Sequence, residues 1–344
     1  QEDMRAKKDS YIEQQSRLMG YKYMIRTIKI TSIIFFILVI FVIYNSFYFD
    51  IPKSEIISKH AVGASEFLEL ADGSKIHFRD EGNKEGEILV MVHGFNGSLF
   101  NYEPLVPYLS DNYRIISLDL PAHGLTGAVE SDLYSHQAYQ NVIEEVVEIL
   151  EVDKFYFVGH SMGGMIAWRY ALDNLDQLNG LIIIGSAFFG NEQEFEDFQT
   201  INAPPVAFEL IESKFFIRLL EFITPRILVK EGISQSVYDQ SIVTDELVDQ
   251  FHDIILMEGT RVAVGRLAEV HEDDFIADPL DLRKITIPSL IIHGEEDNLV
   301  NIRFIDHFIE QIPNSKLISY PKTGHMIPME VPLELSEDIR EFIN

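Results

Sequence analysis

One serine of the sequence stands between glycines at the end of an apolar run. The stretch GHSMG, residues 159–163, fits the pattern G-x-S-x-G with Ser161 at its centre. This pattern suits a sharp turn from a strand into a helix, where a Cβ atom at Gly159 or Gly163 would be crowded. Such a turn lifts the serine hydroxyl above the sheet edge and points the positive end of the next helix at it. Ser161 is therefore a candidate nucleophile, although a serine that only caps a helix would share the pattern.

A serine hydroxyl is a poor nucleophile until a base takes its proton. His325 stands in the stretch YPKTGHMIP, on the loop after the last predicted strand. That base needs a carboxylate to hold its tautomer, and Asp297 follows the preceding predicted strand. Glu295 and Glu296 compete for this role, but Asp297 lies further into the loop and its shorter side chain orients a partner more stiffly. The chain order serine, aspartate, histidine fits a catalytic triad of Ser161, Asp297 and His325.

Attack by a serine on a carbonyl group creates an oxyanion, which backbone N–H groups stabilise. We expect one such donor at Met162, where the helix after the nucleophile begins. The second is expected at Phe95, in the loop HGFNGS that follows an earlier apolar strand. His93 and Gly94 of the same loop are predicted to be structural, because hydrogen bonds of His93 would hold the loop in place.

These residues need a scaffold that brings distant loops together. Continuous apolar runs alternate with amphipathic helical segments along most of the chain. Runs that are apolar throughout are typical of parallel strands buried on both faces. The prediction is therefore an α/β fold, with a mostly parallel central sheet and helices on both faces. Strands are predicted at 75–82, 87–94, 113–120, 154–160, 178–187, 288–294 and 316–321, and helices at 135–151, 161–174, 302–312 and 333–343.

The alternation of strands and helices stops between residues 188 and 284. Helical segments fill this stretch, and it contains no convincing buried strand. We expect residues 188–284 to form a helical cap inserted into an α/β core of residues 60–187 and 285–344. Ligands bind at the carboxyl edge of such sheets, which the cap would cover. Four phenylalanines of the cap could line an apolar substrate pocket or simply pack the cap onto the core: Phe208, Phe215, Phe216 and Phe222.

The N-terminal end of the sequence predicts a membrane anchor. Residues 1–29 carry seven lysines and arginines against four acids, and residues 30–49 carry no charge until the tether at 50–63 begins. About 20 such residues suffice to cross a bilayer. Because only Lys53 and Lys59 follow closely, the positive-inside rule places residues 1–29 in the cytoplasm and the catalytic domain outside it, in the periplasm or extracellular space. The long apolar run has no small-x-small cleavage site after it, which favours an uncleaved signal anchor over a cleaved signal peptide.

Composition argues against several other classes of function. The formal net charge of −28 would repel a phosphate backbone, so nucleic acid is not expected as a partner. Cysteine is absent, which excludes disulfides and thiolate metal sites. The cluster of one histidine and three acids at 271–274 is better explained as a solvated turn than as a metal site, so no metal is expected. Trp168, the one tryptophan, is expected in the core.

Several of these stretches together resemble the α/β-hydrolase family. VHGFNGS, LDLPAHGLTG, VGHSMGG, HGEED and GHMIP match its motifs across residues 60–344. The resemblance implies a serine hydrolase that cleaves carboxylic esters through an acyl-enzyme intermediate, without a cofactor. A membrane-anchored and capped chain is similar to the monoacylglycerol lipases and carboxylesterases of that superfamily, which implies an acyl ester or a small lipid as substrate. Members often have glycine where this chain has Ala122, and Asp119 in the same stretch is expected to be structural.

The same triad serves other reactions within this family. Carbon–carbon bond hydrolases, amidases and cofactor-free haloperoxidases share it. A carbon–carbon bond hydrolase would need a basic residue at the cap pocket, for which Arg218, Arg261 or Arg266 is available. A ligand-binding receptor that kept the fold without catalysis is a further alternative, but such proteins usually lack part of the triad. A serine at position 161 argues against the dehalogenase and epoxide-hydrolase mechanism, which needs a carboxylate nucleophile.

Overall fold

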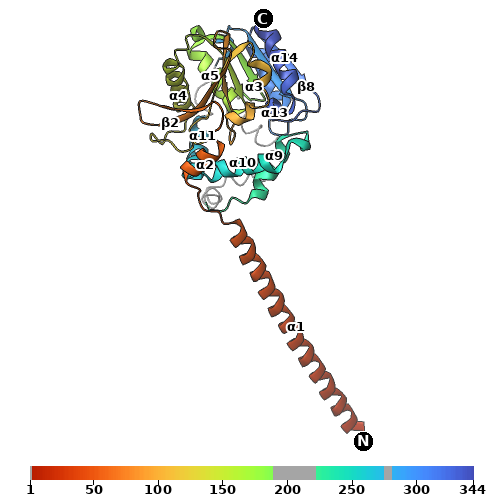
Figure 1. Ribbon diagram of the computed structural model, residues 1–344. Coiled ribbons are helices and arrows are strands. Elements are labelled where there is room, and N and C mark those ends of the chain that lie inside the picture. The colour runs from red at the N-terminus through yellow and green to blue at the C-terminus, as the bar shows by residue number, and fades with distance from the viewer. Residues whose placement is uncertain (1, 189–221, 275–280) are drawn as a thin grey trace. The chain divides into compact units, whose positions relative to one another are not determined.

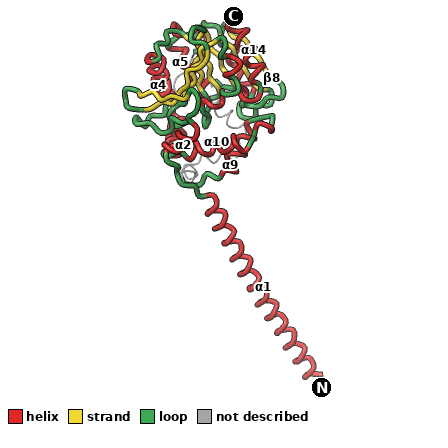
Figure 2. Tube along the Cα trace, in the orientation of Figure 1, coloured by secondary structure: helices red, strands yellow, loops and turns green. Residues whose placement is uncertain are grey.

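The chain divides into two compact units, Gln1–Tyr48 and Phe49–Asn344. The structure is a computed structural model that describes residues 2–188, 222–274 and 281–344. Figure 1 labels the elements of both units, and Figure 2 shows that the strands of the second unit gather in one sheet with helices around it.

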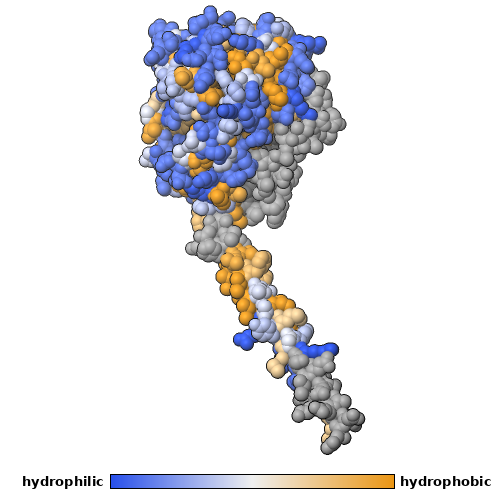
Figure 3. Space-filling view, turned by 90° about the vertical axis from the view of Figure 1, so that its right-hand side faces the viewer, coloured by the Kyte–Doolittle hydropathy of each residue, from blue (hydrophilic) through white to orange (hydrophobic). Residues whose placement is uncertain are grey.

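The first unit is one long helix, α1 (Glu2–Ser46). At 1.5 Å per residue, its 45 residues extend over about 68 Å, more than twice the hydrocarbon thickness of a bilayer. The stretch Arg17–Ile40 contains an 18-residue window with a mean hydropathy of 2.0 and is long and apolar enough to cross a membrane, as either an anchor or a signal sequence. Figure 3 shows apolar residues in the part of this helix toward its C-terminal end and more hydrophilic residues toward its N-terminus. The sequence predicts a span at 30–49; because α1 ends at Ser46, residues 47–49 lie outside the helix.

The second unit is built on one eight-stranded sheet with the strand order β1-β2-β4-β3-β5-β6-β7-β8. Its strands are β1 (Ser65–Glu69), β2 (Lys75–Gly82), β3 (Glu87–Val92), β4 (Tyr113–Leu118), β5 (Phe155–His160), β6 (Leu178–Ile184), β7 (Ser289–Gly294) and β8 (Ser315–Tyr320). The pairings β1–β2 and β2–β4 are antiparallel, and every other pairing in the sheet is parallel. The mostly parallel sheet is confirmed, whereas strand β1 is not predicted by the sequence.

Side chains of the central strand β3 point alternately into two apolar layers, one on each face of the sheet. Val90 and Val92 belong to the first layer, and Leu89 and Met91 belong to the second. Trp168 is buried in the first layer, as predicted. The first layer is covered by α4 (His136–Ile149), α5 (Met162–Asp173) and α12 (Ile302–Gln311), and the second by α3 (Val106–Leu109), α13 (Ile327–Glu330) and α14 (Pro332–Ile343). Helices on both faces of the sheet are therefore confirmed.

The described residues between β6 and β7 add helices, and no strand, to the unit. These helices, together called the helical insertion below, are α9 (Arg226–Ser236), α10 (Asp245–Leu256) and α11 (Thr260–Asp274). Helices α9 and α10 pack through a small apolar cluster of Val229, Ile233 and Val248. Residues 271–274 belong to α11, so the prediction of a turn there is wrong.

Only one of the four cap phenylalanines lies in the described part of the chain. Phe222 is 52% exposed, so it does not pack into the core. Phe208, Phe215 and Phe216 lie outside the described residues.

The segment predicted as a tether contains a packed helix instead. Helix α2 (Lys53–His60) buries Ile56 to 1% exposure and lies beside α10 (Figure 1). The Lys59 ammonium and the His60 ring contact the Asp253 carboxylate of α10 at 2.5 and 2.8 Å. The single apolar contact at Ile56 is a weak pattern, which explains why the sequence did not indicate a helix here.

Backbone and charge contacts hold the residues just before α2. Ile51 forms a parallel bridge with Met257, and the Arg261 guanidinium donates to the Asp50 carboxylate. The start of the second unit is thus attached to the helical insertion.

Candidate active site

Ser161 occupies a strained turn between β5 and α5. Its backbone angles are φ 53° and ψ −119°, a region that costs a residue with a side chain roughly 1–3 kcal/mol. A Cβ atom at Gly159 would collide with the carbonyl of Gly163, and one at Gly163 would collide with the carbonyl of Val92. Both glycines are therefore required by close backbone approach, as the sequence predicts.

His325 and Asp297 form a buried pair. The His325 Nδ1 atom lies 2.7 Å from the Asp297 Oδ2 atom, and both side chains are almost fully buried. The other oxygen of the carboxylate accepts hydrogen bonds from the N–H groups of Leu299 and Val300. Because a carboxylate only accepts, Nδ1 carries the proton and Nε2 has a free lone pair.

The environment keeps Asp297 ionised. Burial opposes ionisation, but the charge and hydrogen bond of His325 and the two backbone N–H groups outweigh it and lower the pKa of Asp297. The competing acids lie elsewhere: Glu295 is exposed, and Glu296 accepts a hydrogen bond from the N–H of Thr323. The geometry thus favours Asp297 as the partner of His325.

Ser161 lies next to this pair through the end of β6. Its N–H donates to the carbonyl of Ile184 at 2.8 Å. The next residue, Gly185, faces the pair: a Cβ atom there would lie 3.5 Å from His325 Nδ1 and 3.6 Å from Asp297 Oδ2. Among the described residues no hydrogen bond joins the Ser161 hydroxyl to His325, and such bonds often form only when substrate binds.

The loop after β3 comes close to the serine. A Cβ atom at Gly94 would lie 2.8 Å from the Cβ atom of Ser161, so glycine is needed for this approach. Phe95 follows in the loop, and Met162 begins α5, where the first N–H groups of a helix have no intrahelical partner. The two predicted oxyanion donors therefore lie on the segments that flank Ser161.

His93 fixes the direction of the Phe95 N–H through the peptide group. The His93 Nδ1–H donates to the carbonyl of Gly94 at 2.7 Å, and the N–H of Gly97 donates to the same oxygen at 3.0 Å. The Gly94 carbonyl and the Phe95 N–H belong to one planar peptide unit, so fixing one fixes the other. The Leu120 N–H donates to His93 Nε2, which commits both ring nitrogens.

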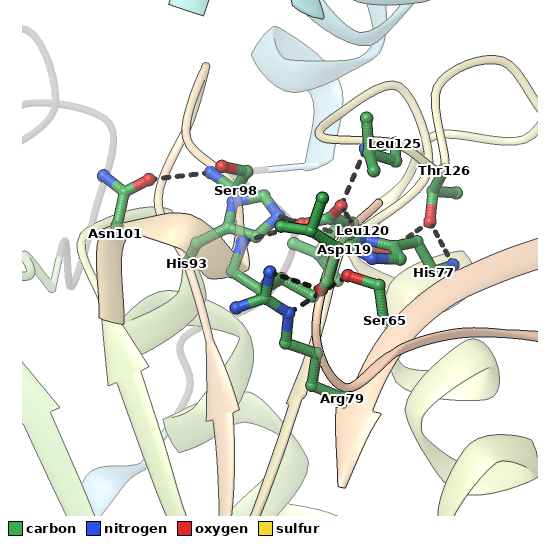
Figure 4. A network of polar contacts seen from close by, with 12 residues as sticks. Ser65, His77, Arg79, His93, Ser98, Asn101, Asp119, Leu120, Leu125 and Thr126 are labelled. Carbon is green, nitrogen blue, oxygen red and sulfur yellow. Dashed lines mark hydrogen bonds and ion pairs between the residues drawn. The ribbon is translucent and has the colours of Figure 1, made fainter. Parts of the chain in front are cut away.

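The buried Asp119 carboxylate anchors the end of the loop 93–98 (Figure 4). Asp119 accepts hydrogen bonds from the His77 ring at 2.6 Å and from the N–H groups of Leu99 and Leu125, each at 2.7 Å. Its side chain is fully buried, and burial opposes its ionisation, but the charge of His77 and these hydrogen bonds lower its pKa. Leu99 follows the loop directly, so Asp119 has the structural position that the sequence predicts.

Ala122 adopts the backbone conformation that favours glycine. Its φ is 69°, and its N–H donates to the carbonyl of Gly127 at 2.7 Å in a tight turn. The residue is fully buried. This is a backbone conformation that glycine adopts more readily than alanine.

Two residues that contact the backbone of His325 and Gly324 are missed by sequence reasoning. The His160 Nε2–H donates to the backbone carbonyl of His325 at 2.8 Å, and the two rings lie 4.9 Å apart. Burial and the charge of His325 lower the pKa of His160 to about 3, so it stays neutral. Glu330 accepts a hydrogen bond from the N–H of Gly324, beside the base. His160 occupies the variable position of G-x-S-x-G, which is the only signal in the sequence that pointed toward it.

The arginines considered for a substrate carboxylate are already engaged. Arg261 contacts Asp50 and the Thr224 hydroxyl, and Arg266 forms an ion pair with Asp132. Arg218 lies outside the described residues. Within the described ranges, no cluster of three or more metal-ligating side chains occurs.

Comparison with known proteins agrees with this architecture. Residues 89–338 match the model of the Alpha/beta hydrolase family. The chain is similar to an uncharacterized hydrolase, YugF, of Bacillus subtilis, with 30% identity over 276 residues that cover 79% of this chain and 95% of that protein. It is also similar to a 2-hydroxy-6-oxononadienedioate/2-hydroxy-6-oxononatrienedioate hydrolase of Comamonas testosteroni, with 26% identity over 272 residues that cover 74% of this chain and 86% of that protein.

A solved structure has the same fold. An esterase from Exiguobacterium antarcticum superposes with a TM-score of 0.65 at 23% identity, covering 80% of this chain and 98% of that one. Together with the family match over residues 89–338, this likeness assigns the fold without assigning a substrate. The chain belongs to the alpha/beta hydrolase family and is a hydrolase.

Proposed function

We propose that this chain is a serine hydrolase that cleaves carboxylic esters of acyl chains or small lipids. The buried His325–Asp297 pair beside the strained Ser161 turn is the observation that carries this proposal. Such a pair orients a base toward a nucleophile, and a strained strand-to-helix turn places the serine at the sheet edge.

In the proposed reaction, His325 Nε2 takes the proton from the Ser161 hydroxyl. At the same time the Ser161 Oγ atom forms a bond to the ester carbonyl carbon. The carbonyl electrons move onto the oxygen, which the N–H groups of Phe95 and Met162 stabilise. When the carbon–oxygen ester bond breaks, His325 returns the proton to the leaving alcohol. A water molecule then repeats the sequence on the acyl-enzyme and releases the acid.

A labelling experiment tests the nucleophile. A fluorophosphonate probe forms a covalent bond with an activated serine, so it should label the wild type and not Ser161→Ala. Hydrolysis of p-nitrophenyl esters from acetate to decanoate then tests the reaction. Labelling of Ser161→Ala at the wild-type rate would overturn the assignment.

A carbon–carbon bond hydrolase is the second candidate, since the Comamonas testosteroni relative carries such a name. The ion pairs of Arg261 and Arg266 weigh against these two arginines as partners of a substrate carboxylate, and the third candidate, Arg218, lies outside the described residues. Comparing 2-hydroxy-6-oxodienoate cleavage with hydrolysis of short- and medium-chain esters separates the two reactions. Tight ligand binding without any turnover would instead favour a non-catalytic receptor.

We also propose that α1 anchors the enzyme in a membrane with residues 1–29 in the cytoplasm. The apolar stretch of α1 and the excess of basic residues before it support this orientation. Protein that stays in membranes after an alkaline carbonate wash, and whose catalytic domain is digested by protease added outside spheroplasts, would agree with this arrangement. Release of the protein from membranes by the carbonate wash would overturn the proposal that α1 is a membrane anchor.

A further inference from the structure

A single carboxylate joins the loop that carries His325, residues 321–326 and called the base loop here, to the helical insertion. Glu330 is the last residue of α13, five residues after His325. Its Oε1 atom accepts a hydrogen bond from the N–H of Gly324 at 2.9 Å. Its Oε2 atom accepts from the N–H groups of Tyr238 at 2.7 Å and Asp239 at 3.1 Å. Tyr238 and Asp239 follow helix α9, so the two oxygens bind two separate parts of the chain.

The two segments also touch directly through their backbones. The N–H groups of His325 and Met326 both donate to the carbonyl of Ser236, at 2.8 and 3.2 Å. A Cβ atom at Gly324 would lie 2.8 Å from the backbone nitrogen of Tyr238, so only glycine permits this approach. The backbone of residues 236–239 therefore contacts the backbone of the base loop directly, without side chains between them.

The segment 236–239 is attached to the packed helices α9 and α10. Ser236 ends α9, and α9 packs on α10 through Val229, Ile233 and Val248. A displacement of these helices would therefore reach Gly324 and His325 through the Glu330 carboxylate and the Ser236 carbonyl.

A second carboxylate holds the same loop from the core side. Glu296 accepts a hydrogen bond from the N–H of Thr323 at 3.0 Å, and its own N–H donates to the carbonyl of Thr323 at 3.0 Å. Glu296 has no hydrogen bond with residues 236–239 among the described parts of the chain. Besides the Asp297–His325 pair, the loop backbone thus has one carboxylate contact from the core, at Glu296, and one that continues to the insertion, at Glu330.

We propose that Glu330 is a positioning residue that couples the helical insertion to His325. The inference rests on the proposed function, because it gives His325 the part of the base. When an acyl chain binds under the insertion, the Glu330 carboxylate keeps His325 aligned with the insertion. Without the Glu330 hydrogen bonds, the rate of proton transfer and the preference for acyl-chain length change together.

Four versions of the full chain, purified in detergent, test this coupling: the wild type, Glu330→Gln, Glu296→Gln and Glu334→Gln. Glutamine keeps the shape of glutamate but replaces one carboxylate oxygen by an NH2 group. This NH2 group cannot accept a hydrogen bond from the backbone N–H that it faces. Glu334 is exposed in the first turn of α14 and serves as the matched control. The measurements are kcat and KM for p-nitrophenyl acetate and octanoate, and the rate of fluorophosphonate labelling.

Glu330→Gln should lower kcat and the labelling rate about tenfold and change the octanoate-to-acetate ratio of kcat/KM at least about threefold, since a displaced element alters kcat and KM together. Glu296→Gln should lower kcat and keep that ratio, and Glu334→Gln should match the wild type. A Glu330→Gln variant with the wild-type kcat and ratio, or one that behaves as Glu296→Gln does, would overturn the coupling.

The outcomes remain distinguishable from failure of the proposed function. If Glu330→Gln does not fold, Glu330→Asp replaces it, because the shorter carboxylate cannot reach both segments, and the same changes are expected. Wild-type turnover with an unchanged Glu330 variant counts against Glu330 alone. A wild type that neither hydrolyses an ester nor reacts with the probe overturns both proposals.

Discussion

Gly94 and Ser161 meet so closely that a methyl group on Gly94 would lie 2.8 Å from the serine Cβ atom. Gly94→Ala should therefore push the proposed oxyanion loop, residues 93–98, away from Ser161, the proposed nucleophile. We expect a loss of roughly 100-fold in kcat, the scale associated with a displacement of about 1 Å in an active site. Steady-state kinetics on p-nitrophenyl butyrate measures it. Gly232→Ala is the control, because a Cβ atom there meets nothing within 4 Å.

The Asp297 carboxylate holds the proton on His325 Nδ1 and leaves Nε2 free. Asp297→Asn would present an NH2 group or a neutral oxygen and allow the wrong tautomer, so kcat should fall by about 10⁴-fold. Glu295→Gln should keep nearly full activity, because Glu295 is exposed. Equal losses in the two variants would contradict the choice of acid.

His93 aims the Phe95 N–H through the Gly94 carbonyl. His93→Leu should lower kcat by roughly 10²–10³-fold, the cost of losing one oxyanion donor, while KM changes little. His93→Asn should recover part of the rate, because its amide can donate to the same carbonyl. A trifluoromethyl ketone, which mimics the oxyanion, should bind more weakly in step with the loss of kcat. Unchanged binding of this inhibitor would show that His93 only stabilises the fold.

His160 makes the folded state sensitive to acid. Its pKa is about 3 in the folded chain and roughly 6.5 when unfolded, so the unfolded state binds the proton first as the pH falls. Its contribution is full above about pH 6.5 and is lost as the pH falls toward 3. Between pH 8 and 5 the free energy of unfolding of the wild type should drop by about 2 kcal/mol more than that of His160→Gln. Denaturant titrations at the two pH values give the comparison, and equal drops would refute it.

Ala122 holds a positive φ that a side chain disfavours. Ala122→Gly removes a backbone penalty of about 1–2 kcal/mol and adds about 0.5–1 kcal/mol of unfolded-state entropy. The variant should be more stable by about 0.5–1 kcal/mol, visible as a rise in Tm, with kcat unchanged. A lower Tm would mean that the lost packing of the buried methyl group outweighs the relief of strain.

The parts of the fold that follow from local pattern could be predicted. The run ILVMV of β3 is apolar throughout because both faces of a parallel strand are covered, and that pattern alone indicates the sheet. Strand β1 escaped prediction because its residues SEFLE are mostly half-exposed and paired at the sheet edge. Helix α2 escaped because only Ile56 is buried in it.

The site shows the same division. Ser161, Asp297 and His325 follow strand ends, so their proximity follows from the parallel order of the strands. The supporting contacts of His160 with His325 and of Glu330 with Tyr238 do not, because the partners are backbone groups of distant segments. A backbone carbonyl or N–H is present in nearly every residue type, so a side chain that binds one cannot be matched to its partner from the sequence.

The attachment of the first residues of the second unit to the insertion matters for anyone who wants this enzyme without its N-terminal helix. Asp50 and Ile51 hold Arg261 and Met257, and Lys59 and His60 hold Asp253. A shortened chain that begins at residue 62 would keep every strand and all three proposed triad members. It would nevertheless strip the insertion of these contacts, so the useful cut lies before Phe49.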